Sequence, residues 1–160
     1  MTNNDILRRI HSIFGFNGTD MIEIFGLAGL QVTQEQVDAW LKEDADKEFQ
    51  KCSDKQLAIF LNGFITHRRG KKEGPQPEPE QQITNNIILK KLKIALDLHA
   101  EDILEILELS NIQIGKHELS AFFRKPGHKH YRDCKDNILN GFLNGVQLMY
   151  SHEAQTDVDS

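Results

Sequence analysis

The stretch Asn3-Asn4-Asp5-Ile6-Leu7-Arg8-Arg9-Ile10 returns later in the chain as Asn85-Asn86-Ile87-Ile88-Leu89-Lys90-Lys91-Leu92. The two stretches are offset by 82 residues, and at the same offset Phe60-Leu61-Asn62-Gly63 returns as Phe142-Leu143-Asn144-Gly145. Matches that share one constant offset across distant positions are the signature of an internal repeat. The sequence therefore predicts two copies of one module.

Each copy has the pattern of four amphipathic helices. In the fourth helix of the first copy, Leu57, Phe60, Leu61, Phe64 and Ile65 follow the i, i+3, i+4, i+7, i+8 spacing of one apolar face. Ser53 with Gln56 and Thr33 with Gln36 have capping-box spacing, and the Asn3-Asn4 pair is interpreted as the cap of the first helix. The predicted fold is all-α, with two tandem, pseudo-symmetric four-helix modules.

Composition sets the predicted boundaries of these modules. The first module covers residues 1–69 and the second covers residues 85–150. Residues 70–84 are rich in proline and glutamate, and prolines at alternate positions favour an extended, semi-rigid linker. Residues 151–160 are polar and acidic and are predicted to be a disordered tail.

Two asparagine-glycine pairs lie inside strong helical patterns, Asn62-Gly63 and Asn144-Gly145. Glycine inside a helix costs about 1 kcal/mol relative to alanine, so its presence in both copies indicates either that another backbone passes close by or that a ligand contacts the helix there. A module of this size buries little surface alone. We therefore expect the two modules to dock about a pseudo-twofold axis, with both asparagine-glycine pairs at the module-module packing contact.

Bulk properties indicate a cytoplasmic protein. The apolar runs are too short to cross a bilayer, the first residues lack the pattern of a signal peptide, and two cysteines do not make a disulfide framework. The net charge of −5 does not favour general nucleic-acid binding, but it leaves room for a local basic patch.

Residues 85–95, continuing to Asp102-Ile103-Leu104, resemble the bacterial YehS-like family of duplicated domains. So does Phe60-Leu61-Asn62-Gly63-Phe64-Ile65, followed by residues 68–71. The resemblance covers nearly the whole chain, including the linker. It implies a bacterial cytoplasmic protein with tandem helical domains, and it brings no activity, substrate or catalytic residue with it.

Charge differs sharply between the copies. Residues 34–53 contain three lysines and six acidic residues, whereas the matching residues 116–135 contain six basic and two acidic residues. Three readings remain open: solvated loops that drifted apart, mutual attraction between modules or between molecules, and an anion or nucleic-acid site on the second copy. The candidate site residues are Lys116, Arg124, Lys125, Lys129 and Arg132.

Other motifs carry weaker indications. A helix-turn-helix would place Gln34-Glu35-Gln36 as a reading helix, yet acids there oppose DNA phosphates. His128, His130 and Cys134 are possible zinc ligands without a second pair. No metal or cofactor is predicted.

Two further features occur at matched positions in both copies. Cys52 and Cys134 are either small buried hydrophobic residues or reactive thiols at a helix start. Asp20 and Asp102, each followed three residues later by a glutamate, either cap a helix or form a catalytic carboxylate pair.

The favoured function is a non-enzymatic binding or adaptor protein that recognises another protein, or a second copy of itself, through a helical surface. The alternative is a nucleic-acid-associated protein that uses the basic residues of the second module and whose affinity falls steeply with salt. A third possibility is an enzyme with a site that no sequence motif reveals, for example around a cysteine.

Overall fold

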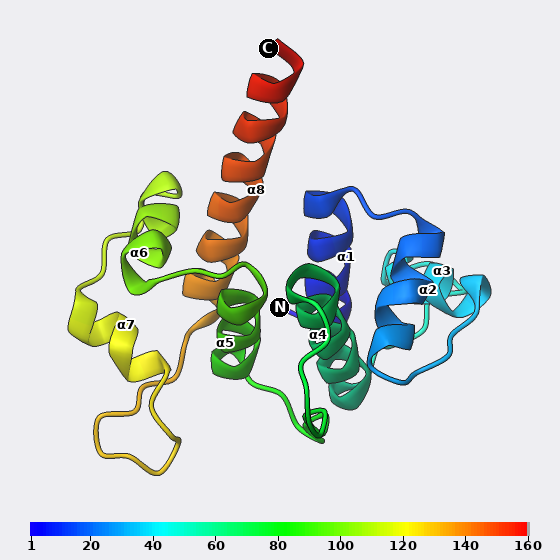
Figure 1. The fold of residues 1–160 in the computed structure, drawn as a ribbon, viewed down its shortest axis with the longest axis horizontal. Helices are drawn as coiled ribbons and strands as arrows, with labels where there is room; N and C mark the ends of the chain where they lie inside the picture. The colour runs from blue at the N-terminus through cyan, green and yellow to red at the C-terminus, as the bar shows by residue number, and fades with distance from the viewer. Residues whose placement is uncertain (160) are drawn as a thin grey trace. The chain divides into compact units, whose positions relative to one another are not determined.

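The computed structural model describes residues 1–159, with side chains described as far as Ser151. In this range it contains helices and no strands (Figure 1). The first copy forms α1 (Asn3–Phe14), α2 (Gly18–Leu27), α3 (Gln34–Leu41) and α4 (Asp54–Arg69). The second copy forms α5 (Asn85–Ala95), α6 (Ala100–Leu109), α7 (Lys116–Phe122) and α8 (Asp136–Asp159). The predicted all-α fold with four helices in each copy is confirmed.

The chain divides into two compact units. Unit 1 comprises Met1–Thr84 with Ile94–Leu96, and unit 2 comprises Asn85–Lys93 with Asp97–Ser160. Docking of the modules about a pseudo-twofold axis stays a prediction. The backbone of residues 151–159 belongs to α8, and the side chains beyond Ser151 lie outside the described part of the chain. The disorder predicted for residues 151–160 stays a prediction.

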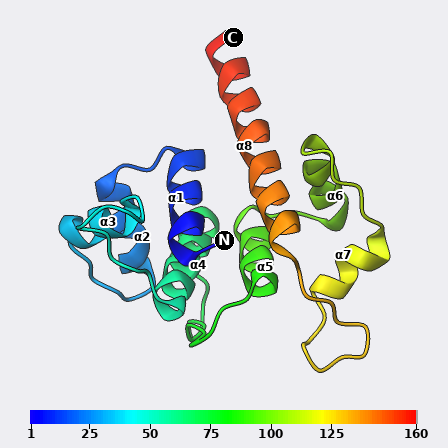
Figure 2. The same cartoon turned by 180° about the vertical axis from the view of Figure 1, so that it is seen from behind.

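The two copies bury matching side chains. In unit 1, α2 packs against α3 and α4, and α1 packs against the same two helices (Figure 2). In unit 2, α6 packs against α7 and α8. The unit 1 core contains Ile6, Leu7, Ile10, Met21, Ile24, Phe25, Val37, Trp40, Leu57, Phe60, Leu61 and Phe64. The equivalents of these twelve residues, 82 positions further on, are also buried, so the duplication preserves most of the core.

Helix α1 is capped by Thr2 and not by the asparagine pair, which corrects the sequence interpretation. The Thr2 hydroxyl accepts from the Asp5 N–H at 3.0 Å, and the Asp5 carboxylate accepts from the Thr2 N–H at 2.8 Å. Asn3 and Asn4 lie in the first turn of the helix, and both side chains bond to the rest of the module. The predicted capping boxes at Thr33 and Ser53 are confirmed.

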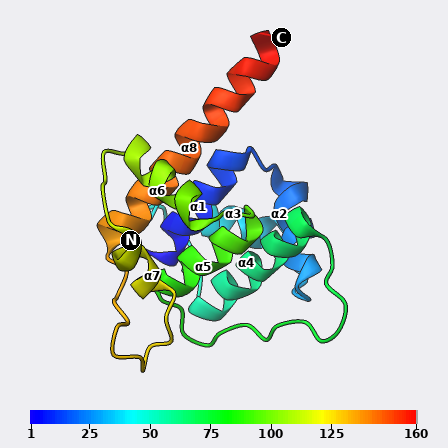
Figure 3. The same ribbon diagram turned by 60° about the vertical axis from the view of Figure 1, so that its left-hand side comes forward.

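The linker leaves α4 at Gly70 and runs as an extended coil to α5 (Figure 3). At its far end the Ile83 N–H donates to Asp54 Oδ2 at 3.1 Å. The other carboxylate oxygen of Asp54 accepts from Asn3 Nδ2 at 2.7 Å. Both bonds favour the charged carboxylate, the one from Asn3 more strongly, and they lower the pKa of Asp54. The start of α1, the start of α4 and the end of the linker thus meet at one carboxylate.

Candidate functional site

The second asparagine of each pair holds the loop that precedes the fourth helix of its copy. Asn86 is buried; its Nδ2 donates to the Phe122 carbonyl at 3.0 Å and to the Arg132 carbonyl at 2.8 Å. Its Oδ1 accepts from the Cys134 N–H at 2.9 Å. Asn4 makes the same three bonds in the first copy. The amide therefore pins both ends of the loop to the core.

The loops held in this way have one backbone design. We call residues 42–50 the acidic loop and residues 124–132 the basic loop. Three bonds from a backbone N–H to a backbone carbonyl recur at the offset of 82. In the acidic loop they run from Asp46 to Glu43, from Phe49 to Asp46 and from Gln50 to Ala39. In the basic loop they run from His128 to Lys125, from Tyr131 to His128 and from Arg132 to Ala121. The charge difference therefore lies on two closely similar supports.

A side chain closes the turn in each loop. In the acidic loop the Glu48 N–H donates to Asp46 Oδ1 at 2.8 Å, and in the basic loop the His130 N–H donates to His128 Nδ1 at 3.0 Å. A histidine nitrogen that accepts a hydrogen bond is unprotonated. A neutral His128 therefore carries its proton on Nε2, which lies 3.5 Å from Arg124 Nη1. That Nε2–H cannot accept a bond, so His128 does not engage the Arg124 guanidinium.

All five predicted anion-site residues are exposed. Four belong to the basic loop, Arg124, Lys125, Lys129 and Arg132, and no ion pair involves any of these four within the described residues. Lys116, at the start of α7, lies 3.8 Å from Glu101, and both side chains are largely exposed. A pair of this kind is worth little, so it leaves the cationic character of the surface intact.

The acidic loop, in contrast, has an internal counter-charge. Arg8 of α1 lies 3.2 Å from Asp44 and 2.7 Å from Asp5, and its Nη1 donates to the Lys42 carbonyl at 2.5 Å. The residue equivalent to Asp44 is Pro126. The second copy therefore has no carboxylate at the position that pairs with Arg8 in the first copy.

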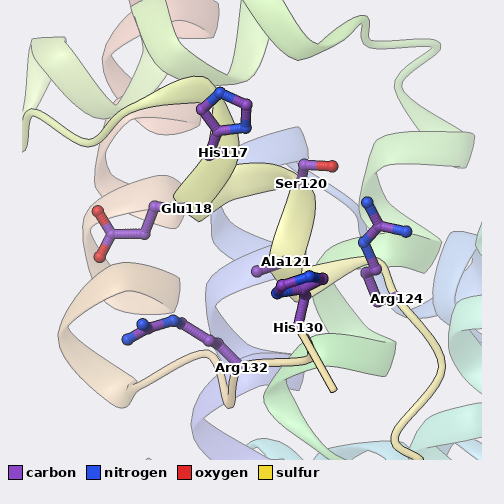
Figure 4. A pocket seen from close by; sticks show the side chains of 7 residues that line it. All are labelled: His117, Glu118, Ser120, Ala121, Arg124, His130 and Arg132. Carbon is purple, nitrogen blue, oxygen red and sulfur yellow. The ribbon is translucent and has the colours of Figure 1, made fainter. Parts of the chain in front are cut away.

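A surface pocket of about 540 Å³ lies between α7 and the returning end of the basic loop (Figure 4). Figure 4 shows Ser120 and Arg124 on one side of it, Glu118 and Arg132 on the other, and His130 between the two arginines. The remaining lining residues are His117 and Ala121. Sequence reasoning found the two arginines by their charge. It missed Ser120 and both histidines as lining residues, because only the fold brings α7 next to the loop.

The first module carries different chemistry at the pocket positions. In place of His117, Ser120, His130 and Arg132 it has Glu35, Asp38, Glu48 and Gln50. Three positions that are neutral or cationic in the second copy are therefore carboxylates in the first. An anion would be repelled at the first-copy positions and attracted at those of the second.

Tyr131 is poorly suited to stacking on a base. Its side chain is only partly exposed. Burial raises the pKa of its hydroxyl, and the hydrogen bond that the hydroxyl donates to Asp133 raises this pKa further. A ring held in this way serves the rim of the core, as its equivalence to Phe49 suggests.

The two cysteines are small buried residues. Cys52 is 0% exposed and Cys134 is 3% exposed, and both are free thiols. Burial raises the pKa of each thiol to about 12, with a smaller contribution from the carboxylate two residues further on. Because the thiolate is the nucleophile, this environment opposes cysteine catalysis at neutral pH.

The remaining sequence candidates resolve into structural roles. Asp20 accepts from the Asn17 N–H at 2.9 Å and Asp102 accepts from the His99 N–H at 2.7 Å, so both carboxylates belong to helix caps. The rings of His128 and His130 lie 5.5 Å apart. Among the described residues, no group of three or more histidine, cysteine or acidic side chains is placed to hold a metal ion.

The glycines of the asparagine-glycine pairs permit close packing inside each module. A Cβ atom at Gly63 would collide with the carbonyl oxygen of Ile24 in α2, and one at Gly145 would collide with that of Ile106 in α6. The expected close backbone is therefore found. Because it belongs to the same module, it gives no argument for packing between modules at Asn62, Gly63, Asn144 and Gly145, and that contact stays a prediction. Asn62 is buried, whereas Asn144 is exposed.

Within the described residues, no helix is both long and apolar enough to cross a membrane. The profile of a family described as "Protein of unknown function (DUF1456)" matches this chain twice, at residues 3–70 and 85–150. The chain is also 43% identical over 147 residues to "Uncharacterized protein YehS" of Escherichia coli (strain K12), a match covering 91% of this chain and 94% of that protein. No solved structure matches. The predicted resemblance to the YehS-like family is confirmed, and the chain belongs to the DUF1456 family.

Proposed function

We propose that this chain is a non-enzymatic binding protein whose second module recognises an acidic protein partner through the basic loop. One observation carries the proposal: the two loops share their backbone design, yet one is acidic and the other basic. The fold is built equally well with either charge. The cations of the second copy are therefore not needed for folding, which points to a role outside the module.

The balance of counter-charges supports this proposal. The acidic loop has Arg8 beside Asp44, whereas the four cations of the basic loop have no ion pair within the described residues. Unpaired surface cations raise the local concentration of anionic partners and speed their association. The proposed location is the cytoplasm, in keeping with two free, buried thiols.

Nucleic acid is the second candidate, because arginine and lysine bind phosphates by the same electrostatics. Two observations make it the weaker one. Glu118 lies at the pocket beside the loop, and Asp133 follows the loop directly, so a backbone with closely spaced phosphates would meet carboxylates. Tyr131, the one tyrosine of the basic loop, is engaged with Asp133.

The test compares binding of poly-L-glutamate, a DNA duplex and an RNA strand across a salt series. The loop variant is Lys125→Glu, Lys129→Glu, Arg132→Glu. The matched control is Lys42→Glu, Lys47→Glu, Lys51→Glu, which makes the same change in net charge in the first module. We expect salt-sensitive binding of poly-L-glutamate that the loop variant loses and the control keeps. Equal loss in both variants, or no binding at low salt, would refute the proposal. Nucleic acid bound more tightly than poly-L-glutamate would favour the second candidate.

A further inference from the structure

We propose that the pocket between α7 and the basic loop binds a phosphate monoester. This inference rests on the proposed function, since the pocket belongs to the same basic surface, and it names the chemistry of the group that is recognised. The pocket has a volume of about 540 Å³ and is open to solvent. It offers guanidinium, imidazole and hydroxyl donors within one site.

Ser120 and Arg124 on one side, with His130 between the two arginines, supply the phosphate contacts (Figure 4). Arginine presents a planar fork of N–H donors that matches phosphate oxygens. The hydroxyl of Ser120 and a ring N–H of His130 are further donors. Since the proton on His128 Nε2 prevents it from accepting a bond from Arg124, the guanidinium can turn its fork toward a ligand.

Charge favours a monoester over a diester. A phosphate monoester carries about −1.5 to −2 charges at neutral pH, whereas each phosphate of a nucleic-acid backbone carries one. Arg124 would contact the phosphate, and Arg132 across the pocket adds a second positive charge that favours the doubly charged group. On the opposite side Glu118 lies near Arg132 in the view of Figure 4, and this side suits the polar remainder of the ligand better than a second phosphate.

The first module shows that these side chains are not required by the fold. The residues equivalent to His117, Ser120, His130 and Arg132 are Glu35, Asp38, Glu48 and Gln50. All four positions of the second module are exposed. Replacing the pocket residues of the second module by their first-module equivalents should therefore leave the backbone intact, because the first module folds with those side chains.

The experiment uses the full chain and follows backbone amide shifts by NMR during titration with inorganic phosphate at neutral pH. In the removal variant, His117→Glu, Ser120→Asp, His130→Glu and Arg132→Gln install the chemistry of the first module. Arg124→Gln alone is a second, milder variant. The graft variant makes the reverse exchange in the first module, with Glu35→His, Asp38→Ser, Lys42→Arg, Glu48→His and Gln50→Arg.

We expect saturable shifts in α7 and the basic loop of the native chain. They should weaken at least tenfold in the removal variant and severalfold in Arg124→Gln, and the graft variant should gain a second site in the first module. Lack of saturation at millimolar phosphate, or equal affinity in the native chain and the removal variant, would overturn the proposal. If poly-L-glutamate still binds in that case, the proposed function stands and only the phosphate pocket is wrong.

Two further arms identify the source of the phosphate. A phosphoserine peptide is compared with its unphosphorylated form, and a small sugar phosphate is compared with the free sugar. Tighter binding of either phosphorylated form at the same amides supports the monoester and shows which source is preferred. An RNA oligonucleotide without a terminal phosphate that binds these amides more tightly than every monoester would overturn the proposal in favour of a diester.

Discussion

Asn4 is expected to be among the most sensitive positions of the first module. It is 1% exposed, and its amide satisfies the carbonyls of Trp40 and Gln50 and the N–H of Cys52, each at 2.9 Å. Asn4→Ala leaves these three backbone groups without their partner. An unsatisfied buried group costs about 1–3 kcal/mol, so the expected loss is about 3–6 kcal/mol, allowing for some entry of water.

That loss is large for a unit of this length, whose free energy of unfolding is roughly 4–12 kcal/mol. The assay is urea unfolding followed by the fluorescence of Trp40, the only tryptophan of the chain and a buried residue of unit 1. With a urea slope of about 1–2 kcal/mol/M, the midpoint should fall by at least about 1.5 M.

Asn3→Ala is the matched control. Asn3 is partly exposed and donates to the Cys52 carbonyl at 3.1 Å and to Asp54 at 2.7 Å. Because water can replace these bonds in part, the control should lose about 1–2 kcal/mol, less than Asn4→Ala. A loss below 1 kcal/mol for Asn4→Ala would refute the reasoning, because it would mean that the buried groups find other partners.

Two further predictions concern packing and the thiols. Gly63→Ala should destabilise unit 1 by about 1–3 kcal/mol in urea unfolding, because the new methyl group would meet the Ile24 carbonyl. Gly26→Ala is the control: nothing lies within 4 Å of its Cβ position, so it should stabilise unit 1 by up to about 1 kcal/mol. The reverse order of the two variants would contradict the packing account. Cys52 and Cys134, each with a pKa raised to about 12, should resist a thiol reagent at pH 8 until the chain unfolds. Since these pKa values are raised above the ordinary value of 9.0, the contribution of the neutral thiols to stability is complete below pH 9 and is lost as the pH rises to about 12. A Cys52→Ala, Cys134→Ala variant should lose less stability than the native chain over this pH range. An equal loss of stability in the variant and the native chain would disprove the raised pKa values.

The fold was predictable because its determinants are local or repeated. Apolar spacing marks α4, the capping boxes mark the starts of α3 and α4, and the constant offset identifies most buried positions of the second copy from the first. The cap of α1 was wrong because Asn3-Asn4 has the composition of a cap. Only the tertiary structure shows that Asn4 bonds to a loop some 46 residues away.

The candidate site was predictable only in part. Charge composition identified Arg124 and Arg132, but it could not show that His117, Ser120 and His130 face the same pocket. Ser120 and His130 become neighbours because Asn86 bonds to the carbonyls of Phe122 and Arg132 and so holds the end of α7 next to the end of the basic loop. For Gly63, the sequence indicates that another backbone passes close by. It does not show that this backbone belongs to α2 of the same module.

The central claim is that the basic loop binds an anionic partner and that the equivalent acidic loop does not. Amide shift mapping of the full chain during titration with poly-L-glutamate tests this claim most directly. We predict shift changes confined to residues 116–135, with none of comparable size in residues 34–53. Equal changes in both segments, or changes that avoid residues 116–135, would contradict it.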